Sequence, residues 1–241
     1  MTAESLRAAG GSGVPRFDAL LDDFGRRIVA HEFAAGQVLR LEDLGAEFAA
    51  SRTVLRDVVR VLEAAGMVSS GRRVGITVRP EADWNHLDPR LLGWQLANPM
   101  TRPGRLLRLS ELRYAVEPVA ASLMATVATP GERARLVLQA EELERVSARA
   151  SQDFIEADVA FHAMLLRFSG NDFFRQFEVG FTAALRGRFE HQLVPDPPDT
   201  EGVHGHVEVS HAILRGDSTT AEILLRSVLN EVIQRFPPAP E

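Results

Sequence analysis

The stretch SRTVLRDVVRVLEAAGMV, residues 51–68, constrains the fold more than any other part of the chain. Its first residue, Ser51, can accept a hydrogen bond from the free N–H groups that begin a helix. Apolar residues then recur at helical spacing, and they are Val54, Leu55, Val58, Val59 and Leu62. The opposite face carries Arg52, Thr53, Arg56 and Arg60. The pattern predicts a helix that is buried on one side and presents guanidinium groups on the other.

The segments on either side predict a helix-turn-helix with a wing. Upstream, residues 41–48 (LEDLGAEF) have the pattern of a shorter helix, and only two alanines separate it from the arginine-rich helix. Two helices joined by so short a turn make a helix-turn-helix. Downstream, residues 67–78 predict a strand, a turn at residues 71–75 and a second strand. The turn contains Arg72 and Arg73, so this wing is basic.

Positive charge is concentrated in the same region. Residues 51–79 hold six arginines and two acids, a net charge of +4, whereas the whole chain carries −6. Arginine can pair with both acceptors on a guanine edge in the major groove, and a local basic patch is the electrostatic footprint of a nucleic-acid reader. Residues 81–241 carry −7 (16 arginines, 23 acids), which argues against DNA wrapping along the whole chain.

The remainder of the chain predicts helices and no convincing strand. The expected helices are 17–31 before the motif, and 88–96, 105–128, 130–150, 153–168, 173–193, 203–215 and 219–236 after it. In 105–128 the predicted buried stripe is Leu109, Leu112, Val116, Val119 and Leu123. We therefore expect a mainly α fold. A winged helix-turn-helix of three helices and a small β wing is followed by an all-α antiparallel helical bundle.

Composition sets the expected domains and compartment. We expect a disordered segment at 1–14, a winged helix-turn-helix at 15–80, a linker at 81–89, a helical domain at 90–236 and a tail at 237–241. There is no cysteine, no apolar run close to the roughly 18 residues of a membrane span and no signal-type apolar core. A cytoplasmic protein without a membrane partner is expected.

The arrangement resembles the FadR branch of the GntR family, from about residue 17 to 236. The first half of the resemblance rests on AGQVLRLEDLGAEFAASRTVLRDVVRVLEAAGMV, residues 35–68. The second half rests on ELRYAVEP (111–118), EADVAFHAMLLRFSGN (156–171) and HVEVSHAILRGD (206–217). The resemblance implies an FCD domain, a helical bundle that binds an effector and forms the dimer. The segment WNHLDPRLLGWQL (84–96) further resembles members that respond to sugar acids, such as galactonate-responsive repressors.

The resemblance also implies which residues contact DNA, namely those at the start of the recognition helix and at the wing tip. The family's positions correspond to Arg52, Thr53, Arg56, Arg72, Arg73 and Gly75, and the neighbouring Arg40, Ser51 and Arg60 complete the set of candidates. Two positions depart from the family pattern. Glu42 stands where the family often has an arginine, with Arg40 nearby, and Val74 replaces the basic residue before the wing glycine.

A metal site is predicted in the second half. Asp158 and His162 are four residues apart, so they share one helical face and can hold one divalent ion, although most such pairs are surface hydrogen bonds. The resemblance implies His206 as the third ligand and places the fourth, a histidine in the family, at Val228. The expected cofactor is therefore a divalent metal ion (zinc, nickel or manganese) with an incomplete ligand set.

Arg113 and Arg186 are the candidate effector-binding residues. Arg113 interrupts an apolar helix, and the simpler interpretation is an ion pair with Glu117, four residues on, worth about 0.3 to 0.5 kcal/mol if exposed. The resemblance implies instead that this helix lines the effector pocket, where a guanidinium suits a carboxylate. Arg186, or else Arg188, would add a second positive edge.

The sequence thus predicts a DNA-binding transcriptional repressor rather than an enzyme. It would bind a pseudo-palindromic operator as a homodimer, and a small organic acid, such as a sugar acid, would control it. One alternative is a metal-responsive regulator. The other is a helical metal-dependent hydrolase in which Asp158, His162 and His206 activate water, but no general base or nucleophile stands beside them in the sequence, and an enzyme would not explain the basic wing.

Overall fold

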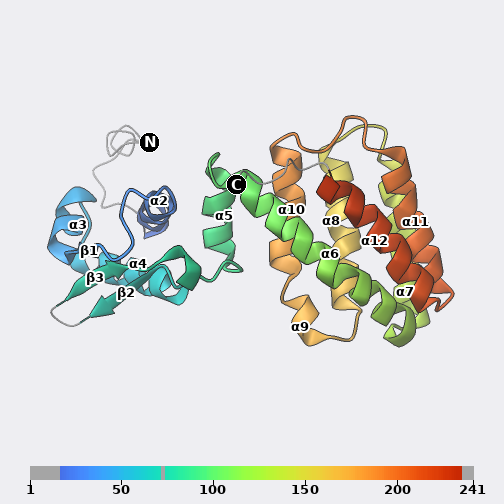
Figure 1. Ribbon diagram of the computed structural model, residues 1–241, viewed down its shortest axis with the longest axis horizontal. Helices are drawn as coiled ribbons and strands as arrows, with labels where there is room; N and C mark the ends of the chain where they lie inside the picture. The colour runs from blue at the N-terminus through green and yellow to red at the C-terminus, as the bar shows by residue number, and fades with distance from the viewer. Residues whose placement is uncertain (1–16, 72–73, 235–241) are drawn as a thin grey trace. The chain divides into compact units, whose positions relative to one another are not determined.

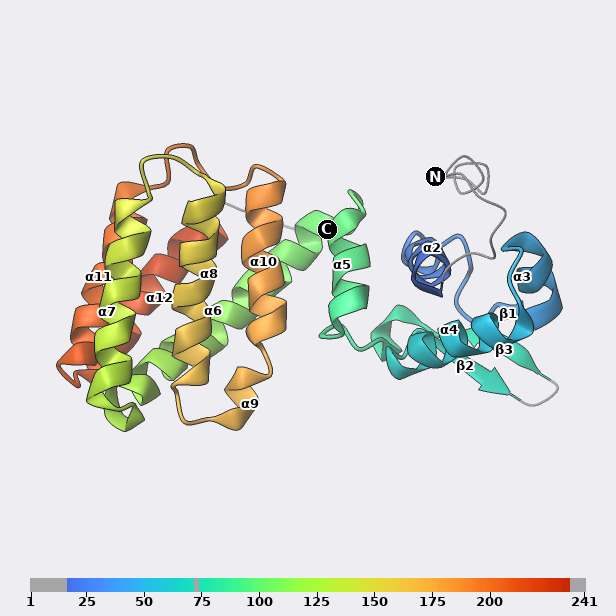
Figure 2. The same cartoon turned by 180° about the vertical axis from the view of Figure 1, so that it is seen from behind.

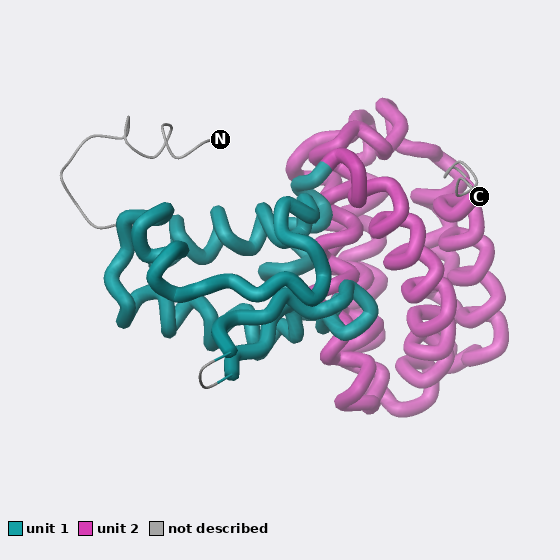
Figure 3. Tube along the Cα trace, turned by 60° about the vertical axis from the view of Figure 1, so that its left-hand side comes forward, with its two compact units in different colours: residues 1–98 teal, residues 99–241 magenta. Residues whose placement is uncertain are grey.

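The computed structural model describes residues 17–71 and 74–234, which form two compact units, residues 1–98 and 99–241 (Figure 3). The expected disordered segment at 1–14 and the tail at 237–241 lie outside the described residues. No helix in the two described ranges is long and apolar enough to cross a bilayer. The mainly α fold is confirmed, with a single small sheet in the described chain.

The first unit contains the expected helix-turn-helix and wing (Figure 1). Its elements are α2 (Phe17–Val29), β1 (Val38–Leu39), α3 (Leu41–Glu47), α4 (Arg52–Ala64), β2 (Val68–Gly71), β3 (Gly75–Val78), a short 3-10 helix (Glu81–Asp83) and α5 (Pro89–Ala97). Ser51 caps α4 by accepting a hydrogen bond from the N–H of Val54 (3.3 Å), as its position predicts. The apolar face of α4, with Leu55 and Leu62 fully buried, packs on Phe24 and Ile28 of α2.

The wing is an antiparallel sheet with the strand order β1-β3-β2. Gly75 is required at the turn, because its φ is +106° and an added Cβ would lie 2.8 Å from the carbonyl oxygen of Leu39. The sequence did not predict β1, in which Val38 pairs with Thr77. Two residues are too few to show a strand periodicity.

Helix α5 belongs to the first unit, and this differs from the predicted linker at 81–89 and domain start at residue 90. Trp94 lies on α2, where a Cβ at Gly25 would come within 2.4 Å of the indole ring. The indole N–H of Trp94 also donates to Asp22 (3.1 Å). The glycine therefore provides the space that lets α5 pack on α2, and the division of the chain falls after Asn98.

The second unit is a helical bundle. Its helices are α6 (Arg102–Val127), α7 (Pro130–Arg145), α8 (Gln152–Arg167), α9 (Asp172–Arg175), α10 (Glu178–Glu190), α11 (Thr200–Leu214) and α12 (Ser218–Gln234). Helices α7, α8 and α10 lie side by side in Figure 2, with α6 and α12 behind them. Helix α6 packs against α8, α10, α11 and α12. The single helix expected at 173–193 is two helices, α9 and α10.

The buried face of α6 differs from the predicted stripe. Leu109 is buried as expected, but Leu112, Val116, Val119 and Leu123 are only half-buried. The fully enclosed positions include Arg113 and Glu117, whose side chains are 1% and 0% exposed. The predicted stripe contained only apolar residues and therefore did not include these two charged residues. Arg113 Nε donates a hydrogen bond to Glu117 (2.8 Å), and this ion pair offsets part of the cost of burying two charges.

Candidate DNA interface and ligand pocket

The exposed face of α4 carries the predicted DNA-binding residues. Arg52 forms an ion pair with Glu42 of α3 (3.3 Å), and both side chains are exposed. Arg60 pairs with Asp57 (3.1 Å) on α4 itself. Arg56 is exposed as well and makes no ion pair within the described part of the chain. Three guanidinium groups therefore project from one helix, and the acid at position 42 already engages one of them.

The other predicted contact residues surround this helix. Arg40 is exposed immediately before α3, and Thr53 is exposed at the start of α4. The Ser51 side chain is engaged in capping the helix, and Gly75 shapes the wing turn. Arg72 and Arg73 lie outside the described residues. A surface hollow between α4 and the wing is lined by Arg56, Arg60 and Gly75, among others.

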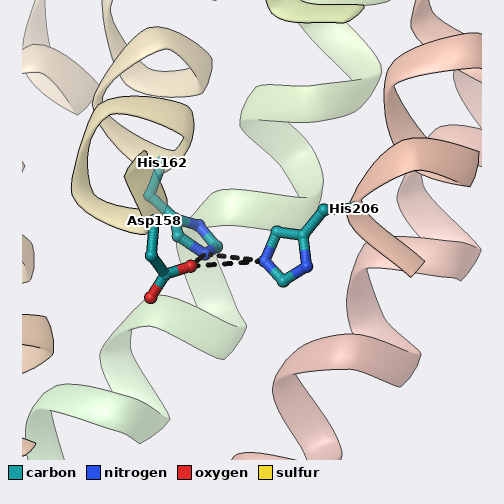
Figure 4. A group of neighbouring side chains, drawn as sticks. All are labelled: Asp158, His162 and His206. Atoms are coloured by element: carbon teal, nitrogen blue, oxygen red, sulfur yellow. Dashed lines mark hydrogen bonds and ion pairs between the residues drawn. The ribbon is translucent and has the colours of Figure 1, made fainter. Parts of the chain in front are cut away.

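The second unit brings the three predicted metal ligands together (Figure 4). Asp158 and His162 project from the same face of α8, and His206 faces them from α11. One oxygen of Asp158 lies 3.4 Å from His162 Nε2 and 3.5 Å from His206 Nε2. The two Nε2 atoms are 3.3 Å apart. The three atoms form a nearly equilateral triangle.

Polar contacts on the Nδ1 side orient both imidazole rings. His206 Nδ1 is 2.7 Å from the carbonyl oxygen of Gly202, which can only accept, so Nδ1 carries the hydrogen. His162 Nδ1 lies 2.7 Å from a carboxylate oxygen of Glu117, an ion-pair contact without the alignment of a full hydrogen bond. The buried ring of Phe161 meets both imidazoles edge-on. Each ring therefore turns its Nε2 toward Asp158.

Burial and charge set the protonation of this group. Burial lowers the pKa of His206 to about 4, so this ring is neutral near pH 7. Burial also acts to lower the pKa of His162, but the charge of Glu117 and the contact with Asp158 raise it above its ordinary value. Although burial alone would raise the pKa of Asp158, the contact with His162 and the charge of that ring hold it well below its usual range. The ionised carboxylate of Asp158 thus favours a positively charged partner at the point where the three groups meet.

The triangle opens on a cavity of about 80 Å³. A cavity needs at least about 10 to 15 Å³ to hold one water, so this one has room for several waters or a small organic molecule. Its charged lining comprises Arg113, Arg188, Asp158, Asp199 and Glu231. Apolar side chains, such as Phe154, Leu185 and Val203, line the rest. Apolar walls with a few convergent polar groups are typical of a small-molecule site.

The structure separates the two candidate arginines of α10. Arg188 is buried and lines the cavity. Arg186, in contrast, is exposed, pairs with Glu156 (2.8 Å) and is absent from the cavity lining. Arg186 therefore adds no positive edge to this cavity, because residues two apart on a helix point in different directions. Arg113, the other candidate, lines the cavity.

Two further residues complete the surroundings of the triangle. Val228, at the position where the family has a fourth ligand, lines the same cavity, and its side chain occupies the space above Gly205. Glu117 was interpreted from the sequence only as an ion-pair partner of Arg113. The four-residue spacing shared by Arg113 with Glu117 and by Asp158 with His162 was the available signal, but it could not show that the two pairs meet.

The fold and the pocket together define a class of protein, a winged helix-turn-helix DNA reader joined to a helical unit that contains a ligand-sized cavity. Comparison with known proteins agrees. Residues 18–78 match the family "Bacterial regulatory proteins, gntR family", and residues 108–231 match the FCD domain. The chain belongs to the GntR family of transcriptional regulators and has an FCD domain.

Individual relatives support the assignment. The galactonate operon transcriptional repressor of Escherichia coli (strain K12) is 30% identical over 207 residues, which cover 85% of this chain and 90% of the relative. The uncharacterised HTH-type transcriptional regulator YieP of the same strain is 34% identical over 160 residues, 66% of this chain and 69% of the relative. These relatives confirm the prediction of a regulator rather than an enzyme.

A solved structure shows the same fold. Lar, which controls the expression of the Listeria monocytogenes agr system, superposes with a TM-score of 0.56 at 16% identity. The match covers 93% of this chain and 98% of Lar.

Proposed function

We propose that this chain is a transcriptional repressor that releases its operator when a small carboxylate, such as a sugar acid, binds in the cavity of the helical unit. The observation that supports it most is the cavity itself, where Arg113 and Arg188 stand beside the Asp158–His162–His206 triangle. A planar guanidinium suits a carboxylate. The similarity to a repressor of the galactonate operon supports both the repression and the sugar acid.

A divalent metal ion, such as zinc, nickel or manganese, fits the triangle. Ligands about 2.0 to 2.1 Å from a tetrahedral ion lie about 3.3 to 3.4 Å from one another. The observed separations are 3.3, 3.4 and 3.5 Å. Asp158, His162 and His206 would hold the ion and leave a position open for an acid ligand, since Val228 offers no donor atom.

Charge makes the metal relevant to an acid effector. Three carboxylates (Asp158, Asp199 and Glu231) and two guanidinium groups (Arg113 and Arg188) line the cavity. Glu117 further neutralises Arg113. An anionic ligand would meet a net negative cavity, whereas a divalent ion adds the positive charge that an anion requires. The acid should therefore bind more tightly in the presence of the ion.

On DNA, two copies of α4 would enter successive major-groove faces. The protein would act as a homodimer on a pseudo-palindrome, with half-sites about 34 to 36 Å apart. The effector can release the operator only if it binds better to the arrangement that does not fit DNA. Such coupling is typically about 1 to 3 kcal/mol, or roughly 5- to 150-fold in operator affinity.

The experiment is an operator-binding titration with fluorescent DNA from the protein's own promoter, against a panel of sugar acids, with and without chelator. The active acid should weaken operator binding, and the chelator should blunt the effect. Arg188→Ala should retain operator binding but lose the response, while Arg186→Ala, two residues away on the same helix, should respond like the wild type. Release by the metal ion alone would instead indicate a metal-responsive regulator, and an equal response in both variants would contradict the proposed pocket.

A further inference from the structure

Glu117 of α6 lies directly behind the triangle of metal ligands. Its side chain is fully buried, and no ligand function falls on it in the proposal above. One carboxylate oxygen is 2.7 Å from His162 Nδ1. The other accepts a hydrogen bond from Arg113 Nε (2.8 Å), while Arg113 Nη2 is 3.4 Å from the first. Glu117 thus joins a ligand of the triangle to an arginine of the cavity.

The position of Glu117 fixes which nitrogen of His162 faces the triangle. An ionised carboxylate can only accept hydrogen bonds, so the hydrogen of a neutral His162 belongs on Nδ1. Nε2 then keeps its lone pair and points at Asp158 and His206. In metal sites, a carboxylate on the remote nitrogen of a histidine ligand holds the ring orientation and makes the ligand more basic.

Charge gives Glu117 a second effect. Arg113 lines the same cavity as the triangle, and its guanidinium is buried. A buried cation beside a divalent ion would repel it strongly, because the interior screens charge poorly. The carboxylate of Glu117 lies between Arg113 and His162 and neutralises the arginine. If Glu117 served only as a structural ion-pair partner, it would need to contact Arg113 but not His162, a ligand of the proposed metal centre.

We propose that Glu117 is a positioning residue of the Asp158–His162–His206 centre, which orients His162 and shields the bound ion from Arg113. The inference rests on the metal ion of the proposed function. It predicts that metal affinity depends on Glu117, although its carboxylate does not contact the ion. Removal of this carboxylate should weaken metal binding without any change at the three ligands.

The test compares Glu117→Gln with the wild type in the full chain. Cobalt(II) is the probe, measured by its visible spectrum and by competition with a chelator of known affinity. Loss of such an outer contact typically weakens metal binding about 10- to 100-fold, and the cobalt spectrum should change with the orientation of His162. Glu111→Gln, an exposed carboxylate on the same helix, is the matched control and should bind like the wild type.

A second pair of measurements guards against misfolding. Glu117→Gln leaves Arg113 buried without a charged partner, so Arg113→Met/Glu117→Gln restores charge balance and should still bind cobalt about 10- to 100-fold more weakly. In the metal-free wild type, at a pH above the pKa of His162, NMR of the imidazole nitrogens should show the His162 hydrogen on Nδ1, and in the variants the two tautomers should be mixed.

The possible results distinguish the role of Glu117 from the metal centre and from the proposed repressor function. Equal cobalt affinity and an unchanged spectrum in Glu117→Gln and the double variant would overturn the role of Glu117 and leave the metal centre intact. Failure of the wild type to bind cobalt or zinc would reject the metal centre together with this inference. The operator-binding titration with acids would still test the repressor function, because that measurement does not depend on the metal centre or on Glu117.

Discussion

Arg52 provides the sharpest test of the DNA-reading surface. Its guanidinium pairs with Glu42 at 3.3 Å, and the side chains are 72% and 64% exposed. An exposed pair of this kind contributes at most about 1 kcal/mol, whereas a bidentate base contact discriminates by about 1 to 3 kcal/mol. DNA binding exchanges the first interaction for the second. We therefore expect Arg52→Ala to weaken specific binding by about 1 to 2 kcal/mol, roughly 5- to 30-fold.

The same exchange predicts an opposite effect for Glu42→Gln. This variant frees Arg52 and removes a negative charge that would lie close to phosphate. Operator affinity should rise by a few tenths to about 1 kcal/mol. The rise should shrink as salt is added, because salt screens exposed charges.

Fluorescence anisotropy with the promoter fragment and with random duplex, at several salt concentrations, measures both effects. Arg52→Ala should lose more affinity for the promoter than for random DNA, because a base contact carries sequence preference and a phosphate contact does not. Arg145→Ala is the control, since this exposed arginine pairs with Glu142 on α7 in the other unit. Unchanged promoter affinity in Arg52→Ala would refute the assignment of α4 as the reading helix.

Two further predictions concern the wing and the metal centre. Gly75→Ala places a Cβ 2.8 Å from the Leu39 carbonyl at a φ of +106°, so it should destabilise the first unit by about 1 to 3 kcal/mol. Both tryptophans, Trp84 and Trp94, lie in that unit, so denaturant unfolding followed by tryptophan fluorescence measures its stability. The control is Gly93→Ala, whose added Cβ meets no atom within 4 Å and should cause no loss of stability. Equal unfolding midpoints for the two variants would contradict the predicted strain at Gly75. Metal affinity should fall as the pH is lowered through the pKa of His162, which is raised above its usual value of about 6.5, because the ion must displace a proton there. Calorimetry in buffers of different ionisation enthalpy should show about one proton released per ion at pH values below that pKa, and no release would contradict the protonated state of His162.

The sequence by itself determined the elements whose patterns are local. Ser51 and the apolar stripe after it specified the start and the buried face of α4, because a helix cap and a 3.6-residue period act within a few turns of chain. The wing turn followed from Gly71 and Gly75, which end one short strand and begin the next. Asp158 and His162 were placed on one helical face by their spacing alone.

Only the tertiary structure decided which charged residues are buried and where they meet. Arg113 and Glu117 of α6 are buried as an ion pair, and His162, from a helix distant in sequence, approaches Glu117. Arg188 rather than Arg186 lines the cavity because the packing of α10 on α8 sets the rotation of that helix. The spacing of apolar residues cannot show which charged residues find a partner far away in the sequence. The burial of a charge depends on such partners, and they come together only in the folded chain.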